Sequence, residues 1–124
     1  MNKKRPINLD LTTIKQPPTA IVSILHRASG FLVFLFIPFL LCVLASSLSS
    51  DVDFLRLKAE LANPVVKFFL WVFLSGLLYH LVAGIRHLMM DMHIGETLPG
   101  AKKSAYGVMA ISLILIVLAG VWIW

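Results

Sequence analysis

Three long apolar segments, separated by polar stretches, dominate the pattern of hydrophobic and polar positions along the chain. They cover about residues 21–48, 65–91 and 104–124. A bilayer core of about 30 Å needs roughly 20 helical residues to cross it. The pattern therefore predicts an all-α membrane protein with three transmembrane helices within residues 21–124.

Breaks in the pattern mark where these helices begin and end. Pro17-Pro18 precede the first helix, with Thr19 expected as its cap, and Asn63-Pro64 start the second. Gly95 and the pair Pro99-Gly100 separate the second helix from the third. The stretch between the first two helices is expected to be a solvated loop, because its charged residues are Asp51, Asp53, Arg56, Lys58 and Glu60.

Composition and charge support the membrane class and exclude others. Hydrophobic residues make up 59% of the 124 residues and charged residues only 14%, too few to cover the surface of a soluble domain. The net charge is +5, but the basic residues lie beside apolar segments and form no stripe interleaved with aromatic residues. Membrane lipids, and not nucleic acid, are therefore the expected partners. The single cysteine, Cys42, can form no intrachain disulfide and is interpreted as an apolar helix residue.

The distribution of basic residues predicts an orientation in the membrane. They gather before the first helix and around the end of the second, as Lys3, Lys4, Arg5, Lys15, Arg86, Lys102 and Lys103, with Arg86 just inside the second helix. The positive-inside rule then makes residues 1–20 a cytoplasmic N-terminal segment and puts the C-terminus on the periplasmic side. The polar start resembles neither a signal peptide nor a transit peptide, which favours a bacterial inner membrane. The tryptophans fall near the outer interface, at Trp71, Trp122 and Trp124.

One face of the second helix carries polar residues at the depth of the bilayer. His80, Gly84, His87 and Asp91 are spaced by 4, 3 and 4 residues, so they share a narrow stripe. The stripe has two interpretations: it bonds a partner helix, or it faces a cofactor. The depth of His80 favours the cofactor, because a neutral imidazole in hydrocarbon leaves its acceptor nitrogen unsatisfied unless something binds it.

A haem iron would satisfy that nitrogen, which makes His80 the candidate axial ligand of a b-type haem. Its other ring nitrogen would then be left for a hydrogen-bond acceptor of the protein. Gly84 removes side-chain bulk where a flat macrocycle would lie. His87 is about 10 Å along the helix, too far to bind the same metal but suited to the haem propionates. The chain supplies one ligand for each haem, so the second must come from another chain or be absent.

A polar cluster on the first helix lies at a similar depth and contains Ser23, His26, Arg27 and Gly30. Antiparallel packing of the first two transmembrane helices is expected to bring it to the layer of His87. One interpretation is structural: Arg27 extends its charge to the interface, and Ser23 belongs to the helix start. The other is a quinone site, because a hydroxyl and a guanidinium can bind a quinone carbonyl and stabilise the anion formed on reduction.

Two further residues near the end of the second helix are interpreted structurally. Asp91 is expected to pair with Arg86, Arg27 or a histidine, and His93 is expected to be a solvated loop residue. The sequence has no glycine-rich phosphate loop and no cysteine cluster for iron–sulfur ligation. The chain alone is therefore not expected to catalyse a redox reaction on a soluble substrate.

Three motifs in order resemble the cytochrome b membrane-anchor subunits of succinate dehydrogenase, respiratory complex II. They are Arg5-Pro-Ile-Asn-Leu-Asp10, Ser23-Ile-Leu-His-Arg-Ala-Ser-Gly30 and His80-Leu-Val-Ala-Gly-Ile-Arg-His-Leu-Met-Met-Asp91. The resemblance extends over nearly the whole chain. It implies a role in electron transport that links the tricarboxylic acid cycle to the aerobic respiratory chain.

The resemblance also implies partners, site residues and an assembly, in which residues 21–124 form an anchor domain that is part of a heteromeric helix bundle. A flavoprotein subunit oxidises succinate, an iron–sulfur subunit passes the electrons on, and two small anchor subunits bind haem b and ubiquinone. The residue at His80 ligates the haem iron, and the second anchor subunit gives the other axial histidine. Residues at Ser23 and Arg27 line the quinone site, while those at His26 and His87 approach the haem propionates. The flavin and the iron–sulfur clusters lie on the partner subunits.

Three alternatives remain open from the sequence. The chain can be the anchor of a quinol-oxidising fumarate reductase, in which electrons flow in the reverse direction. It can be a haem-free structural anchor whose polar stripe only joins helices. A transporter subunit that uses Arg27 and Asp91 is disfavoured, because the sequence shows neither broken helices nor inverted repeats.

Overall fold

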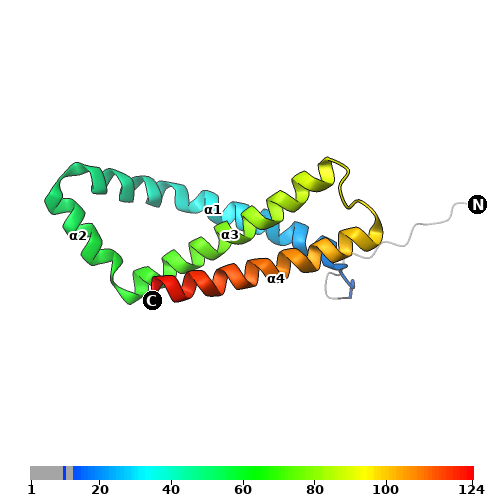
Figure 1. Cartoon of the computed structure of the whole chain (residues 1–124). Helices are drawn as coiled ribbons and strands as arrows, with labels where there is room; N and C mark the ends of the chain where they lie inside the picture. The colour runs from blue at the N-terminus through cyan, green and yellow to red at the C-terminus, as the bar shows by residue number, and fades with distance from the viewer. Residues whose placement is uncertain (1–9, 11–12) are drawn as a thin grey trace, which may run out of the picture.

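The structure, a computed structural model, describes residue 10 and residues 13–124. Its helices are α1 (Pro18–Ser49), α2 (Asp51–Leu61), α3 (Pro64–Asp91) and α4 (Leu98–Ile123) (Figure 1). No β-strand occurs among these residues. The helices α1, α3 and α4 are long and apolar enough to cross a bilayer. The prediction of an all-α protein with three membrane-spanning helices is therefore confirmed, whereas Lys3, Lys4 and Arg5 lie outside the described residues.

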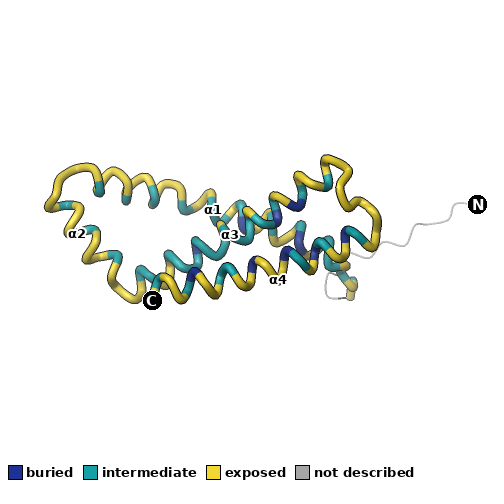
Figure 2. Tube along the Cα trace, viewed as in Figure 1, coloured by how far each residue is buried: buried dark blue, intermediate teal, exposed yellow. Residues whose placement is uncertain are grey.

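The three long helices pack unevenly along their length. Figure 1 shows α3 and α4 side by side, with α1 crossing α3 and then diverging from it toward α2, which closes the open end. Buried positions concentrate in the half where α1, α3 and α4 meet (Figure 2). Val22, Ala83, Ala105 and Val108 form the core of that half. Small residues such as alanine let helix backbones approach closely, as is usual between helices in a membrane.

Most large apolar side chains remain exposed on the isolated chain. Phe34 is 65% exposed and Leu113 63%. Contiguous exposed apolar surface of this extent marks contact with lipid or with other protein. The chain is therefore built to be surrounded by a bilayer or by further helices, and it buries little surface of its own.

Two predicted helix starts are wrong. The residue that precedes α1 is Pro17, with no side-chain cap, and Thr19 lies within the first turn and not before it. The last helix begins at Leu98 and not near residue 104, because Thr97 caps it by accepting a hydrogen bond from the amide of Gly100. Pro99 is tolerated there since amides of the first turn need no helical acceptor. The start of α3 after Asn63 is confirmed.

The expected loop between the first two spans contains a helix, α2. The hydroxyl of Ser50 accepts from the amide of Asp53 at 3.1 Å and donates to its carboxylate at 2.7 Å. Ser49 donates to the same carboxylate at 2.9 Å. The Ser50 and Ser49 hydroxyls lower the pKa of Asp53 from its ordinary value. This reciprocal cap satisfies amides at the helix start and explains why a charged, polar stretch is helical.

The end of the molecule beside α2 gathers aromatic residues. The indole nitrogen of Trp71 donates to the carbonyl of Ile116 at 3.0 Å, which ties α3 to α4. The ring centroids of Trp71 and Trp124 lie 6.3 Å apart. This agrees with the predicted aromatic belt at one interface, since amphipathic tryptophan rings favour that layer.

Candidate functional site

His80 and His26 meet face to face where α3 crosses α1. Their ring centroids lie 4.2 Å apart, with an angle of 12° between the ring planes. The Nδ1 atom of His80 lies 3.0 Å from the carbonyl oxygen of His26 and 3.2 Å from Oγ of Ser29. The Ser29 hydroxyl, in a side chain only 8% exposed, donates to the same carbonyl at 2.8 Å. These contacts fix the rotation of the His80 ring.

The contacts also define which nitrogen of His80 is available. A carbonyl oxygen can only accept, so Nδ1 carries the hydrogen when it bonds to His26. The neutral ring then keeps its lone pair on Nε2. In the part of the chain that the structure describes, Nε2 of His80 has no hydrogen-bond partner. This is the arrangement in which an imidazole binds a metal through one nitrogen and a protein acceptor through the other.

Two glycines allow the helices to approach at this point. A Cβ atom on Gly30 would lie 2.9 Å from Cε1 of His80, closer than real side chains approach. A Cβ on Gly84 would lie 3.4 Å from Nε2 of His26. The group beside Gly84 in this structure is thus the His26 ring, on the face where the sequence predicts a macrocycle. Gly30 is required for the close packing of His80.

His87 continues the histidine cluster toward the end of α3. Its ring centroid lies 4.9 Å from that of His26, at an angle of 46°. The α1 ring therefore lies against both α3 rings, as the expected antiparallel packing of the two helices requires. The sequence placed His26 and His87 in the same layer, but it gave no indication that His26 would stack on His80.

Ser23 and Arg27 lie beside this cluster on α1. Ser23 is half-buried and Arg27 is exposed. Neither side chain has a hydrogen-bond partner among the residues whose positions are described. Their separation of four residues places both on one side of the helix. A hydroxyl and a guanidinium with free donors therefore face outward near the histidines.

The expected pairing of Asp91 with Arg86 is absent. Asp91 is exposed, and within the described residues the only ion pair joins His93 to Glu96 at 2.9 Å. Arg86 turns toward α4, where Nε donates to Oγ of Ser104 at 2.9 Å. The prediction that His93 lies in an exposed loop is confirmed.

Sequence reasoning missed three polar residues that hold the helices together, namely Ser29, Tyr79 and Ser104. The hydroxyl of Tyr79 donates to the carbonyl of Val22 at 3.2 Å, next to the histidine cluster. Ser29 lies inside the quoted motif of the first helix, three residues after His26, and that spacing on one helix side was the available signal. The sequence held no signal for Ser104, because its partner Arg86 is on another helix.

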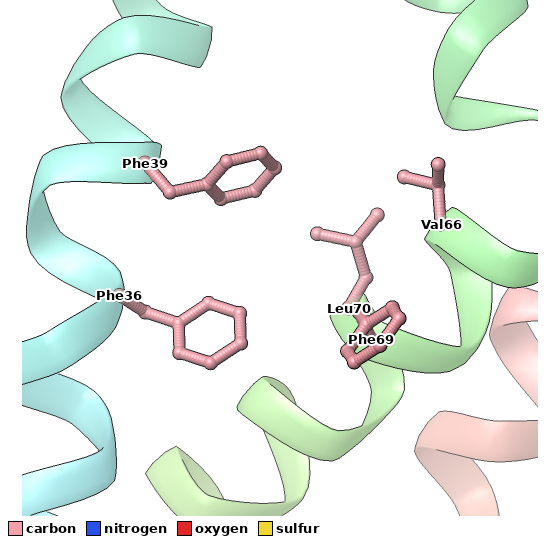
Figure 3. Close-up of a pocket in the computed structure, with 5 residues that line it drawn as sticks. All are labelled: Phe36, Phe39, Val66, Phe69 and Leu70. Carbon is pink, nitrogen blue, oxygen red and sulfur yellow. The ribbon is translucent and has the colours of Figure 1, made fainter.

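An apolar cavity of about 240 Å³ lies between α1 and α3, away from the histidines. Figure 3 shows its lining side chains, all of them hydrocarbon: Phe36, Phe39, Val66, Phe69 and Leu70. A cavity without polar groups cannot orient a redox ligand by hydrogen bonds. The cavity therefore lacks the hydrogen-bonding groups that the histidine cluster has.

Three apolar spans, with a cluster of half-buried histidines where two of them cross, define a small helical integral-membrane protein. The family described as succinate dehydrogenase/fumarate reductase transmembrane subunit matches residues 1–119, and the chain belongs to this family. The motif resemblance found in the sequence is thereby confirmed.

Relatives from several bacteria are similar over nearly their full length. The succinate dehydrogenase cytochrome b556 subunit of Coxiella burnetii is 50% identical, with 100% of each chain covered. That of Paracoccus denitrificans is 33% identical, covering 92% of this chain and 88% of the relative. That of Rickettsia prowazekii is 31% identical, covering 93% and 90%. The chain is thus a cytochrome b type membrane-anchor subunit of succinate dehydrogenase.

Proposed function

We propose that this chain anchors a succinate:ubiquinone oxidoreductase in a bacterial inner membrane and binds haem b through Nε2 of His80. The observation that carries the proposal is the 3.0 Å contact between Nδ1 of His80 and the carbonyl of His26. It holds the imidazole in the tautomer that a metal ligand needs. The relatives' printed names, cytochrome b556 subunit, support the same cofactor.

Haem b, when bound, supplies a carrier of single electrons. The residues of this chain hold the imidazole in place, keep a proton on Nδ1 and limit rotation of the ring. His26 and His87, which contact one another, would lie near the haem propionates. The second axial histidine would come from another small anchor subunit, so the haem would lie at the interface between two chains.

Ser23 and Arg27 would form part of the ubiquinone-reduction site. Their donors have no partner among the described residues, so a quinone carbonyl can accept hydrogen bonds from both. The guanidinium charge would stabilise negative charge that develops on the quinone oxygen as it is reduced. Binding in this layer would keep the quinone beside the histidine cluster.

The remaining subunits would complete electron transfer from succinate. A flavoprotein with its flavin and an iron–sulfur protein with its clusters would dock on the cytoplasmic side. The N-terminus would face that side and the C-terminus the periplasm, as the basic residues indicate. The family also includes fumarate reductase subunits. A fumarate reductase anchor that oxidises quinol is therefore the second candidate.

A reduced-minus-oxidised spectrum of the purified complex tests the proposal, with succinate as the reductant. A b-type band that develops with succinate is expected. If the complex oxidises succinate with an artificial dye but shows no such band even with a strong reductant, the chain is a haem-free structural anchor.

A further inference from the structure

We propose that the groove between α3 and α4 at their connecting loop binds an anionic phospholipid, with Arg86 as the ligand of its phosphate. Arg86 is 5% exposed, and its guanidinium donates to Oγ of Ser104 at 2.9 Å and to the carbonyl of Ala101 at 3.2 Å. Both acceptors are neutral, so they satisfy donors without balancing the charge. A buried cation is stable only when a counter-charge lies near it.

The chain itself does not supply that counter-charge. It has six acidic side chains, all of them at described positions: Asp10, Asp51, Asp53, Glu60, Asp91 and Glu96. The one ion pair recorded among the described residues joins Glu96 to His93, and Arg86 takes part in none. A guanidinium has five N–H donors, and the hydrogen bonds to Ser104 and Ala101 engage two of them. No acceptor among the described residues engages the remaining donors, and Arg86 lines the groove.

The shape of the surroundings indicates what carries the anion. Arg86 lies at the side of a groove of about 300 Å³ whose other lining is almost entirely apolar. It includes Ile85, Met89, Ile94, Gly107, Val108 and Ile111. Ile85 and Ile111 are each 51% exposed, and α1 contributes no lining residue, so the groove opens away from the bundle. Such a groove fits one acyl chain beside a charged head group.

The depth of Arg86 agrees with a lipid phosphate. Arg86 precedes the end of α3 at Asp91 by about 7.5 Å, and Ser104 follows the start of α4 by about 9 Å, at 1.5 Å per residue. Both therefore lie near the membrane–water boundary, where phosphates are abundant. Lys102 and Lys103 add positive charge in the first turns of α4. A net negative lipid is therefore favoured over a zwitterionic one.

Gly107 provides a way to test the groove apart from the charge. A Cβ atom on Gly107 would meet no atom within 4 Å, although the residue lines the groove. A leucine there would begin from a Cβ that meets no described atom and would extend into the space proposed for the acyl chain. Arg86→Gln instead removes the charge and leaves the groove open. Arg56→Gln is the matched control, because Arg56 is an exposed arginine on α2.

The experiment is photolabelling of the intact purified complex with phosphatidylglycerol that carries a diazirine in one acyl chain, followed by peptide mapping. We expect labels on α3 and α4 peptides of the groove, displaced at least about tenfold better by unlabelled phosphatidylglycerol than by phosphatidylcholine. Arg86→Gln should reduce the label at least about fivefold, because it removes one charge-assisted contact to the phosphate. Gly107→Leu should also reduce the label at least about fivefold, because the leucine takes the space of the acyl chain. Arg56→Gln should leave it unchanged.

Three results would overturn the proposal. They are equal displacement by both lipids, full labelling of the Gly107→Leu complex, and a groove that stays unlabelled while other peptides of the complex are labelled. The last would show that the groove does not hold this lipid in the complex. If Arg86→Gln prevents assembly, lipid competition on the wild type and the Gly107→Leu variant still decide. Haem content is independent of these labels, so failure here is distinguishable from failure of the proposed function.

Discussion

The carbonyl oxygen of His26 lies 3.0 Å from Nδ1 of His80, although 54 residues separate the two in sequence. A residue of α1 thereby determines the tautomer of a residue of α3. Ser29 is part of the same contact, because its hydroxyl donates to the carbonyl and its oxygen lies 3.2 Å from Nδ1. The properties of a haem ligated by His80 should therefore depend on α1.

Ser29→Ala should raise the haem midpoint potential. The substitution removes one acceptor from Nδ1–H, which makes the imidazole a weaker donor to iron and destabilises the oxidised state. A hydrogen bond of about 1 kcal/mol corresponds to a shift of about 40 mV for one electron. The measurement is a redox titration of the haem band in the purified complex. Ser75→Ala is the control, because Ser75 donates to the carbonyl of Trp71 on its own helix. Equal potentials in wild type and Ser29→Ala would exclude this influence.

Gly30→Ala should reduce the haem content of the complex, although alanine favours helix more than glycine does. The added Cβ would lie 2.9 Å from Cε1 of the His80 ring, which its hydrogen bonds hold in place. Gly76→Ala is the matched control on α3. Its Cβ would meet only the side chain of Leu32, at 2.7 Å from Cδ2 and 3.6 Å from Cγ, and that flexible side chain can move. The measurement is haem per flavin. The same haem content in both variants would mean that the ring has room to shift.

Arg27→Leu should lower quinone reduction at least about tenfold, the effect of removing a charged hydrogen-bond donor. Oxidation of succinate with an artificial dye should persist, because that reaction needs only the partner subunits. The measurement compares the two activities in one membrane preparation. Arg56→Leu, on the exposed α2 helix, should retain both. Parallel loss of both activities in Arg27→Leu would indicate failed assembly instead of a quinone role.

Asp53→Asn should loosen α2 at neutral pH. Hydrogen bonds from Ser50 and Ser49 lower the pKa of the Asp53 carboxylate, so its contribution is present above the ordinary pKa. That contribution is lost as the pH falls through the lower value of the folded state. Amide hydrogen exchange in residues 51–61 should be faster in the variant. Asp51→Asn should have the smaller effect, because Ser50 and Ser49 donate to Asp53. Identical exchange in both variants would show that the cap does not stabilise α2.

The bounds of a helix were predictable from the sequence where they depend only on the residues of that helix. The three spans follow from apolar length alone, and Asn63-Pro64 gave the start of α3 correctly. The helix α2 was missed because its composition is charged, although the capping pair Ser50 and Asp53 was readable. The early start of α4 was missed because Pro99 and Gly100 were read as breakers, whereas the first turn tolerates them.

The residues of the histidine cluster were predictable from the sequence, but the contacts between them were not. Periodicity found His80 and His87 on one stripe, yet the sequence grouped Gly30 with Ser23, His26 and Arg27 as one polar cluster of the first helix. In the structure Gly30 turns toward His80 together with His26 and Ser29. How a helix is rotated against its neighbour depends on packing between chain segments, and the pattern of one helix does not contain it. The contact between Arg86 and Ser104 was not predicted for the same reason.

Ligation of the haem iron by His80 is tested most directly by the reduced-minus-oxidised spectrum of the complex that carries His80→Leu. His93→Leu is the control, because His93 is an exposed loop histidine that pairs with Glu96. Recovery of all the subunits in the purified complex confirms that it has assembled. If His80 ligates the haem, His80→Leu loses the b-type band or binds haem too weakly to retain it, while His93→Leu keeps the wild-type spectrum. An assembled His80→Leu complex with unchanged haem content and spectrum would contradict it.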